Sequence, residues 1–150
     1  MKHRNAQEFV VDSCVFAKLF LEENDQEKAL KFFNELAVRR CKIYVPSIFL
    51  FEVLNVCSVN KINEEDVFFL INRYQKFGLQ IVNPSEKTLR NALKMTKIGH
   101  KKSGYPSFYD CVYHALAIEL DCQFITSDFK HITKAKKFGS IKSLDEIYDE

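Results

Sequence analysis

The sequence lacks long apolar runs and a strong charge imbalance. No stretch reaches the roughly 18 consecutive apolar residues that a membrane-spanning helix needs. The start, MKHRNAQEF, also has no apolar run typical of a signal peptide. With 22 Lys and Arg against 20 Asp and Glu, the net charge of +2 is too small for a polycationic mode of binding. We therefore expect a cytoplasmic protein that does not enter a membrane and whose contacts with any nucleic acid are local.

Closely paired cysteines are also missing. The 5 cysteines are odd in number and never occur as C-x-x-C, which argues against a disulfide framework and a zinc knuckle. They are interpreted as small core residues in a reducing compartment. The 150 residues, of which 47% are apolar and 28% charged, are typical of one globular domain, expected over residues 1–150.

Short apolar runs alternate with segments whose apolar residues recur at helical spacing. Strands are expected at 9–11, 43–45, 79–82 and 123–126, with a last edge strand near Ile141. Helices are expected at 14–22, 25–40, 46–59, 63–78, 84–99, 107–120 and 129–139. In this pattern Pro46 opens its helix, and the inward residues of the helix at 84–99 are Leu89, Ala92, Leu93 and Thr96. The alternation predicts an α/β fold with a mostly parallel sheet covered on both faces.

Two acids stand at the ends of expected strands. Asp12 follows Phe9-Val10-Val11, and Asp128 follows the strand at 123–126. In open parallel sheets the ligand crevice lies at the carboxyl ends of the strands, so the two carboxylates should share one crevice if their strands are neighbours. The alternative is that each acid merely caps the helix after it, a role that Asp fills well.

Two more acids lie on expected helices. Glu52 sits in the nearly all-apolar segment IFLFEVL, where burial of a carboxylate is costly unless it is paired or binds a metal. Asp110 lies in the first turn of its helix, where it can simply favour the helix start. Together with Asp12 and Asp128 these acids form a set of oxygen ligands without Cys or His, which favours Mg²⁺ or Mn²⁺ over zinc.

Four segments in order resemble the PIN-domain nucleases, most closely the VapC-type toxins of bacterial toxin–antitoxin pairs. The segments are FVVDSCVFAKLF (9–20), PSIFLFEVLNV (46–56), SFYDCVYHALAIEL (107–120) and FITSDFKHI (124–132). The resemblance implies a three-layer α/β/α sandwich around a sheet of four or five strands. It also implies a metal-dependent ribonuclease, inhibited by a partner antitoxin and forming a homodimer. The family's acidic quartet falls on Asp12, Glu52, Asp110 and Asp128, and its supporting hydroxyls on Ser13 and Thr126.

Other features suggest how RNA and a partner protein would bind. Lysines and histidines after residue 96 can border the crevice and hold RNA phosphates, although a solvated charged face is an equal alternative; the candidates are Lys101, Lys102, Lys130 and His131. Phe68 and Phe69 lie off the apolar stripe of their own helix, so if exposed they would mark a partner surface. His114 is interpreted as a packed residue.

Two classes of function fit these patterns. One is a metal-dependent endoribonuclease toxin, and the other is a PIN-like module that binds RNA or protein without cutting, or another Mg²⁺-site protein such as a phosphoryl-transfer domain. The acid inside an apolar helix favours the nuclease. A carboxylate-held metal lowers the pKa of water, so water is the expected nucleophile. The histidines His3, His100, His114 and His131 are too scattered to predict a pair that activates the 2′-hydroxyl.

Overall fold

The computed structural model describes residues 7–148, so His3 lies outside the described residues. Its centre is a five-stranded sheet in the order β3-β2-β1-β4-β5, in which every neighbouring pair is parallel. The strands are β1 (Glu8–Val11), β2 (Lys42–Pro46), β3 (Leu79–Val82), β4 (Gln123–Thr126) and β5 (Ile141–Ser143). The expected strands are confirmed, and β1 and β4 are neighbours, as a crevice shared by Asp12 and Asp128 requires.

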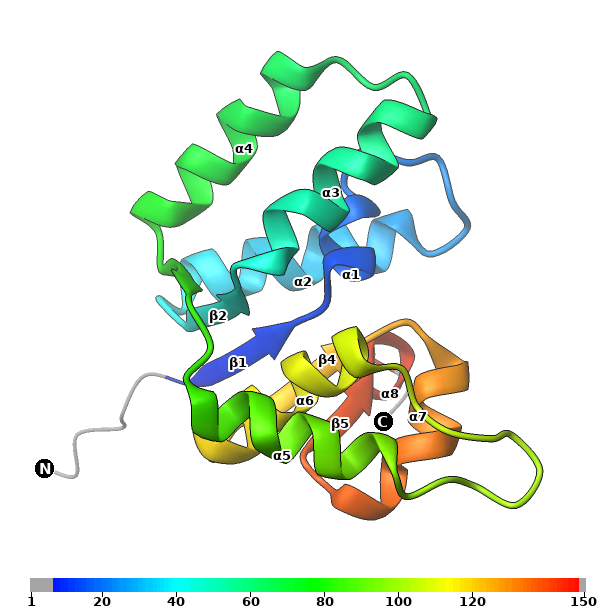
Figure 1. The fold of residues 1–150 in the computed structure, drawn as a ribbon. Helices are drawn as coiled ribbons and strands as arrows, with labels where there is room; N and C mark the ends of the chain where they lie inside the picture. The colour runs from blue at the N-terminus through cyan, green and yellow to red at the C-terminus, as the bar shows by residue number, and fades with distance from the viewer. Residues whose placement is uncertain (1–6, 149–150) are drawn as a thin grey trace, which may run out of the picture.

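Helices connect the strands and cover both faces of the sheet (Figure 1). They are α1 (Ser13–Ala17), α2 (Gln26–Val38), α3 (Ile48–Val59), α4 (Glu64–Lys76), α5 (Glu86–Thr96), α6 (Phe108–Glu119), α7 (Phe129–Ala135) and α8 (Leu144–Tyr148). Parallel strands need such crossovers because each strand must return to the same edge before the next begins. The expected α/β/α sandwich is therefore confirmed. Among residues 7–148 no helix is both long and apolar enough to span a bilayer.

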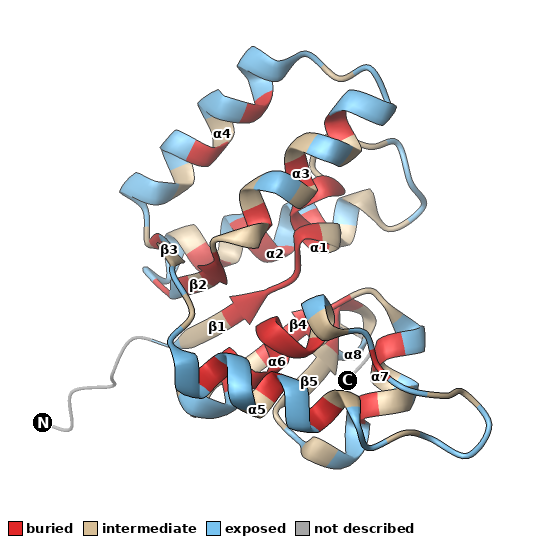
Figure 2. Ribbon diagram, in the orientation of Figure 1, coloured by how far each residue is buried: buried red, intermediate tan, exposed pale blue. Residues whose placement is uncertain are grey.

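Alternating strand residues pack against opposite helical layers. On one face, Phe124 of β4 stacks on Tyr113 of α6, with ring centroids 5.7 Å apart. On the other, Phe9 of β1 meets Phe32 of α2 edge to face at 5.9 Å. Buried residues accordingly line β1 and the inner sides of the helices (Figure 2). The sheet is thus covered on both faces, and its carboxyl-terminal edge is left to carry polar side chains.

Many of the phenylalanines are structural. Phe16 of α1 lies at the centre of an aromatic cluster and contacts the rings of Phe20, Phe33, Phe49 and Tyr74 at centroid distances of 5.2 to 6.0 Å. Edge-to-face contacts of this kind add to the stabilisation from burial. The cluster joins α1 to α2, α3 and α4, and so fixes the helix that follows Asp12.

Two expected helix boundaries are wrong. Pro46 ends strand β2 instead of opening a helix, because it pairs with Val82 and the next residue, Ser47, still donates a backbone hydrogen bond to the Val82 carbonyl at 2.9 Å. Helix α1 ends at Ala17, well before residue 22. The next residue, Lys18, is buried, and its Nζ forms ion pairs with Glu23 Oε2 at 2.6 Å and Asp25 Oδ1 at 3.0 Å. The chain after α1 bends so that these two acids reach Lys18.

The expected inner face of α5 is wrong at its two leucines. Leu89 and Leu93 are exposed, whereas Ala92 is buried as expected, together with Thr88 and Met95. The buried residues follow helical spacing and pack α5 against α6. Thr88 also donates a hydrogen bond to the carboxylate of Glu119 of α6. This polar anchor fixes the rotation of α5 and leaves its two leucines outside. The short helix α8 was not predicted.

Candidate active site

Asp12 lies at the carboxyl end of β1 and is held by hydroxyl groups. Thr126 at the end of β4 donates a 2.7 Å hydrogen bond to Oδ2 of Asp12, and Ser13 donates one of 3.3 Å to Oδ1. The backbone amide of Asp12 also donates to the carbonyl of Ile125 at 2.9 Å, which ties the two strand ends together. The side chain of Asp12 makes no capping hydrogen bond to α1, so the alternative capping role is not observed here.

The environment of Asp12 disfavours its charged form. The residue is only 4% exposed, and burial raises its pKa from 3.8 to about 6. The negative charge of Asp110 raises the pKa further, whereas the hydrogen bond from Thr126 lowers it. No cation is among the groups that shift this pKa. Asp12 is thus a buried carboxylate that other carboxylates approach, and within residues 7–148 no positive charge is among the groups that act on it.

Glu52 approaches Asp12 from helix α3. Phe49 and Val53 of the same helix face the core, and Glu52 lies at the edge of that buried face. Its Oε1 accepts a 2.8 Å hydrogen bond from the phenol of Tyr113 in α6. Burial raises the pKa of Glu52, the bond from Tyr113 lowers it, and the charges of Asp12 and Asp110 raise it. Glu52 is therefore within electrostatic reach of both aspartates.

Asp110 is fixed by the start of helix α6. Ser107 caps this helix: its hydroxyl donates a 2.7 Å hydrogen bond to Oδ2 of Asp110 and accepts one from the Asp110 amide at 3.3 Å. Burial raises the pKa of Asp110, the Ser107 bond lowers it, Asp128 raises it and Lys134 lowers it. Asp110 therefore lies in the first turn of α6, as the alternative role of favouring the helix start expects. This position also brings it within electrostatic reach of Asp12, Glu52 and Asp128.

Asp128 caps helix α7, which is the alternative role that the sequence allowed for it. Its Oδ1 accepts hydrogen bonds from the backbone amides of Lys130 and His131 at 3.0 and 3.2 Å, which caps α7. Its own amide donates to the Thr126 hydroxyl at 3.0 Å. Thr126 thus links Asp128 to Asp12. A second role in binding a metal stays a prediction for Asp128.

The donor set fits a hard divalent cation. The four side chains offer only carboxylate oxygens, which Mg²⁺ and Mn²⁺ prefer. A cation would also offset the charge on the uncompensated Asp12. Within residues 7–148, however, no three Asp, Glu, His or Cys side chains lie close enough together to hold a metal ion in this conformation. Glu52, Asp110 and Asp128 instead each accept hydrogen bonds from donors of their own, so closing on a cation requires side-chain rotations.

One predicted phosphate contact is wrong. Lys101, Lys102 and Lys130 are exposed, but His131 is only 2% exposed. His131 Nε2 lies 3.2 Å from Nδ1 of His114, whose Nε2 lies 2.6 Å from the carbonyl of Gly139. Because a carbonyl only accepts, His114 donates to Gly139 and accepts from His131. Burial lowers the pKa of both histidines to about 4, so the pair is neutral and faces the core near pH 7.

Tyr113 is a contact of the acids that the sequence interpretation missed, whereas Lys134 is one of the lysines expected to border the crevice. Tyr113 lies three residues after Asp110 on α6, a spacing that places two side chains on one helix face. That spacing could have identified Tyr113 as a neighbour of the acids. The sequence did not indicate that Lys134 comes near Asp110 in particular, because the two residues lie on different helices.

Comparison with known proteins gives a family and a fold. Residues 9–137 match the model of the PIN domain family. The crystal structure of PAE2754 from Pyrobaculum aerophilum is similar to this chain, with a TM-score of 0.60 and 16% sequence identity. The similarity covers 98% of this chain and 92% of that one. No curated protein sequence matches the chain.

Proposed function

The chain belongs to the PIN domain family, whose members are generally nucleases, and we propose that it is a metal-dependent endoribonuclease acting in the cytoplasm as the toxin of a type II toxin–antitoxin pair. The proposal assigns residues 1–150 to one PIN domain. The observation that carries it is Asp12, a buried carboxylate within reach of the charges of Asp110 and Glu52 and without a cation. A binding module has no need of such an arrangement, which destabilises the fold.

In this proposal Asp12, Glu52, Asp110 and Asp128 hold Mg²⁺ or Mn²⁺. When bound, the cation lowers the pKa of water and stabilises the charge that builds up on the phosphate oxygens. Thr126 and Ser13 orient the carboxylate of Asp12, Tyr113 orients Glu52, and Ser107 orients Asp110.

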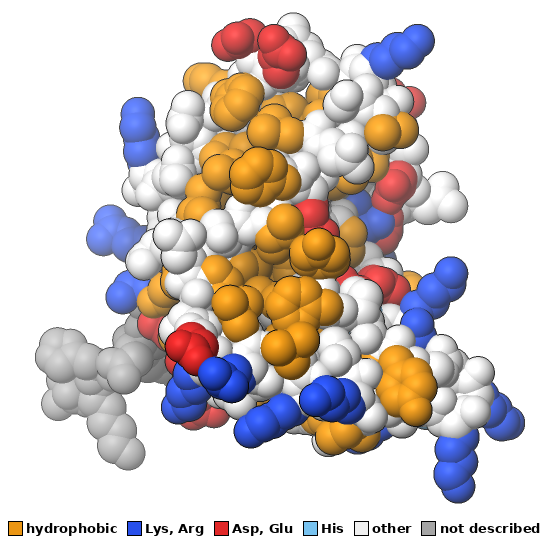
Figure 3. Space-filling model, viewed as in Figure 1, with side chains coloured by type: hydrophobic (Ala, Val, Ile, Leu, Met, Phe, Trp, Pro, Cys, Tyr) orange, Lys and Arg blue, Asp and Glu red, His pale blue; other side chains and the backbone are white. Residues whose placement is uncertain are grey.

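The proposal also includes a homodimer and an antitoxin that covers the helices α3 and α4. We define the apolar face as Phe51 of α3 and Phe68 and Phe69 of α4, which are 70%, 43% and 64% exposed. Figure 3 shows exposed apolar side chains gathered over these helices and continuing downward to α5. Exposed aromatic rings on two helices that contact one another are typical of a protein interface. An amphipathic or extended antitoxin segment is the partner that this face fits.

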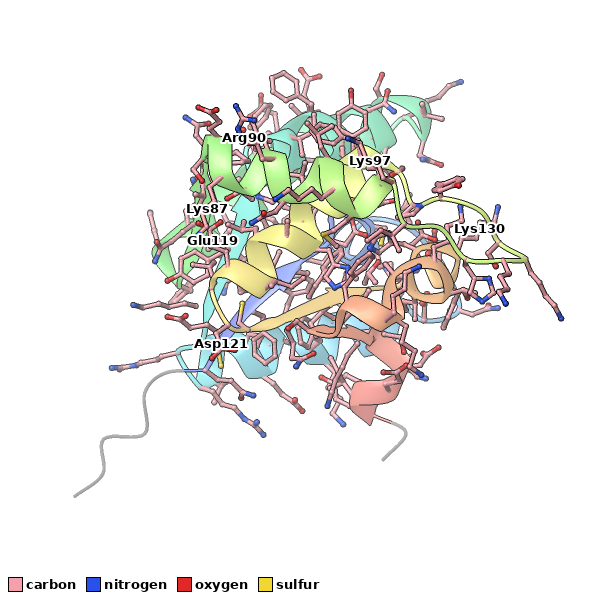
Figure 4. All side chains as sticks on the ribbon, turned by 60° about the horizontal axis from the view of Figure 1, so that its bottom comes forward. Lys87, Arg90, Lys97, Glu119, Asp121 and Lys130 are labelled. Carbon is pink, nitrogen blue, oxygen red and sulfur yellow. The ribbon has the colours of Figure 1, made fainter. Side chains whose placement is uncertain are left out.

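Cleavage of end-labelled RNA tests the nuclease directly. The protein should cut RNA with Mg²⁺ or Mn²⁺ and stop cutting with EDTA. Asp121→Asn is the matched control for Asp110→Asn, because Asp121 is an exposed acid just before β4, at the opposite edge of the sheet (Figure 4). Loss of cleavage in the Asp110 variant alone supports the proposal. Binding of RNA without cleavage under every metal condition would favour the non-cleaving module.

A further inference from the structure

A surface groove begins at the residue that follows Asp128. Its lining is Ser103, Phe129, Lys130, Thr133 and Lys134. Helix α7 supplies one wall, and Ser103, from the segment between α5 and α6, supplies the other. Figure 1 shows this segment beside α7, and Figure 4 shows Lys130 beside it. The groove therefore adjoins the candidate active site.

The groove carries the positive charge of two lysines. Within the part of the chain that the structure describes, neither Lys130 nor Lys134 forms an ion pair with an acidic side chain. The charge of Lys134 is within electrostatic reach of Asp110. One ammonium group is thus near the acids and the other is on the outer side of α7. Two unpaired cations beside a carboxylate site favour a ligand with phosphate groups.

An exposed aromatic ring lines the same groove as these two lysines. Phe129 is 58% exposed. It lies between Asp128, which is partly buried, and Lys130, whose backbone amide donates a hydrogen bond to Asp128. Its ring adds no buried contact that the core needs. An aromatic ring beside two lysines suits a nucleic-acid base, because every base has a flat face that stacks on an aromatic side chain. A peptide without acidic side chains would leave the two ammonium groups without a partner.

We propose that this groove binds one unpaired nucleotide of the RNA, with its base stacked on Phe129 and the neighbouring phosphates held by Lys130 and Lys134. The inference rests on the proposed nuclease function and adds the condition that the substrate is single-stranded at this nucleotide. A base in a duplex is stacked and paired on both sides, so it cannot lie on the Phe129 ring.

Binding measured without cleavage tests the groove. Fluorescence anisotropy of a short fluorescein-labelled single-stranded RNA, recorded in EDTA, gives the Kd of the wild-type chain and its variants. Phe129→Leu keeps the apolar bulk but removes the stacking face, and should weaken binding by at least about fivefold. Phe129→Tyr keeps the stacking face and should bind within about twofold of wild type. Equal binding by the Leu variant would overturn the proposal.

The lysines are tested through the salt dependence of binding. Lys130→Gln and Lys134→Gln should each reduce the slope of log Kd against log salt by about 0.7, the value for one phosphate contact on a single strand. Lys87→Gln is the control, because Lys87 is an exposed lysine far from Lys130, on the opposite side of the molecule in Figure 4. Slopes that change equally in all three variants would contradict the assignment.

A change in the RNA tests the groove on the wild-type chain, whose folding no substitution can disturb. Single abasic sites placed along the RNA should weaken binding to wild type at one position and have no further effect on Phe129→Leu at that position. Annealing the RNA to its complement should remove the difference between wild type and the Leu variant. If the abasic scan leaves wild-type binding unchanged at every position, the groove does not hold a base. If the proposed nuclease function is wrong but the groove is right, the protein will not cleave RNA in Mg²⁺ or Mn²⁺, while Phe129→Leu will still bind RNA more weakly than wild type.

Discussion

The phenol of Tyr113 donates a 2.8 Å hydrogen bond to Oε1 of Glu52, and so connects α6 to the acid of α3. Tyr113 is fully buried and its ring stacks on Phe124 of β4. A core residue therefore determines where a site carboxylate lies. Glu52 itself is only partly buried.

Tyr113→Phe should weaken catalysis more than stability. The ring keeps its stacking on Phe124, while the bond that lowers the pKa of Glu52 is lost, so that pKa should rise. One hydrogen bond is worth about 1 kcal/mol, or about fivefold in rate. We expect a pH–rate profile whose acidic limb moves to higher pH, with activity largely recovered at alkaline pH. A uniform loss at every pH would contradict the positioning role.

Asp110→Asn should abolish cleavage without destabilising the metal-free protein. The substitution removes a negative charge that raises the pKa of both Asp12 and Glu52. The Ser107 hydroxyl keeps an oxygen acceptor in the amide. The melting temperature in EDTA should therefore equal or exceed that of wild type. Unchanged cleavage would remove Asp110 from the site.

The stability of Asp12→Asn relative to wild type should depend on pH. Burial raises the pKa of Asp12 from 3.8 to about 6, so between these values the folded protein keeps a proton that the unfolded chain has lost. Wild type therefore loses stability from this group as pH rises through that window, in total by about 3 kcal/mol. His114 and His131, with pKa lowered to about 4, act in the opposite direction and are common to both proteins.

The difference between the two proteins isolates Asp12 from these histidines. In urea unfolding in EDTA, the free energy of unfolding of the variant should rise relative to that of wild type from about pH 4 to about pH 6. Added Mg²⁺ should reduce the gap at the higher pH, because it offsets the charge of Asp12 in wild type. A free-energy difference that stays constant with pH would show that Asp12 is not held in this environment.

Phe68→Glu combined with Phe69→Glu should weaken binding of the antitoxin. Both rings belong to the exposed apolar face, and placing two charges there makes its burial by a partner costly. The fold should persist, because the buried residues of α4 are Val67 and Ile71. Isothermal titration with the antitoxin measures the effect. Unaltered affinity would exclude this face.

Light scattering tests the dimer separately. We expect wild type to be a dimer at tens of micromolar, within the range where standard-size interfaces form. A clean monomer at that concentration would contradict the homodimer without touching the nuclease assignment.

The products of cleavage should carry a 5′-phosphate and a 3′-hydroxyl. Hydrolysis by water does not need the 2′-hydroxyl, so a 2′-deoxy substitution at the cut nucleotide should leave cleavage intact if it does not disturb binding. The alternative is attack by the 2′-hydroxyl, with a histidine as general base. The structure disfavours it, because His131, the histidine nearest to Asp128 in sequence, is buried and paired with His114. Mass spectrometry of the products decides between them. A 2′,3′-cyclic phosphate would reject the water mechanism.

The local sequence determined the strands and the order of the candidate acids. Apolar runs such as Phe9-Val10-Val11 that end on an acid specify a buried parallel strand and its carboxyl end, and this needs no knowledge of distant residues. The four acids could be named because each lies in a short segment that resembles the family. Their roles as metal ligands stay a prediction.

The tertiary structure decided what each polar side chain faces. Asp12 and Asp128 are both strand-end acids in sequence, but only Asp128 caps its helix, because Thr126 on the neighbouring strand binds Asp12. His131 is polar and lies among lysines in the sequence, yet His114, 17 residues earlier, draws it into the core. Leu89 and Leu93 were expected inside, but the packing of α5 on α6 through Thr88 and Ala92 leaves them exposed. Burial and pairing depend on which elements meet, and segments far apart in sequence meet only through the packing of the whole chain.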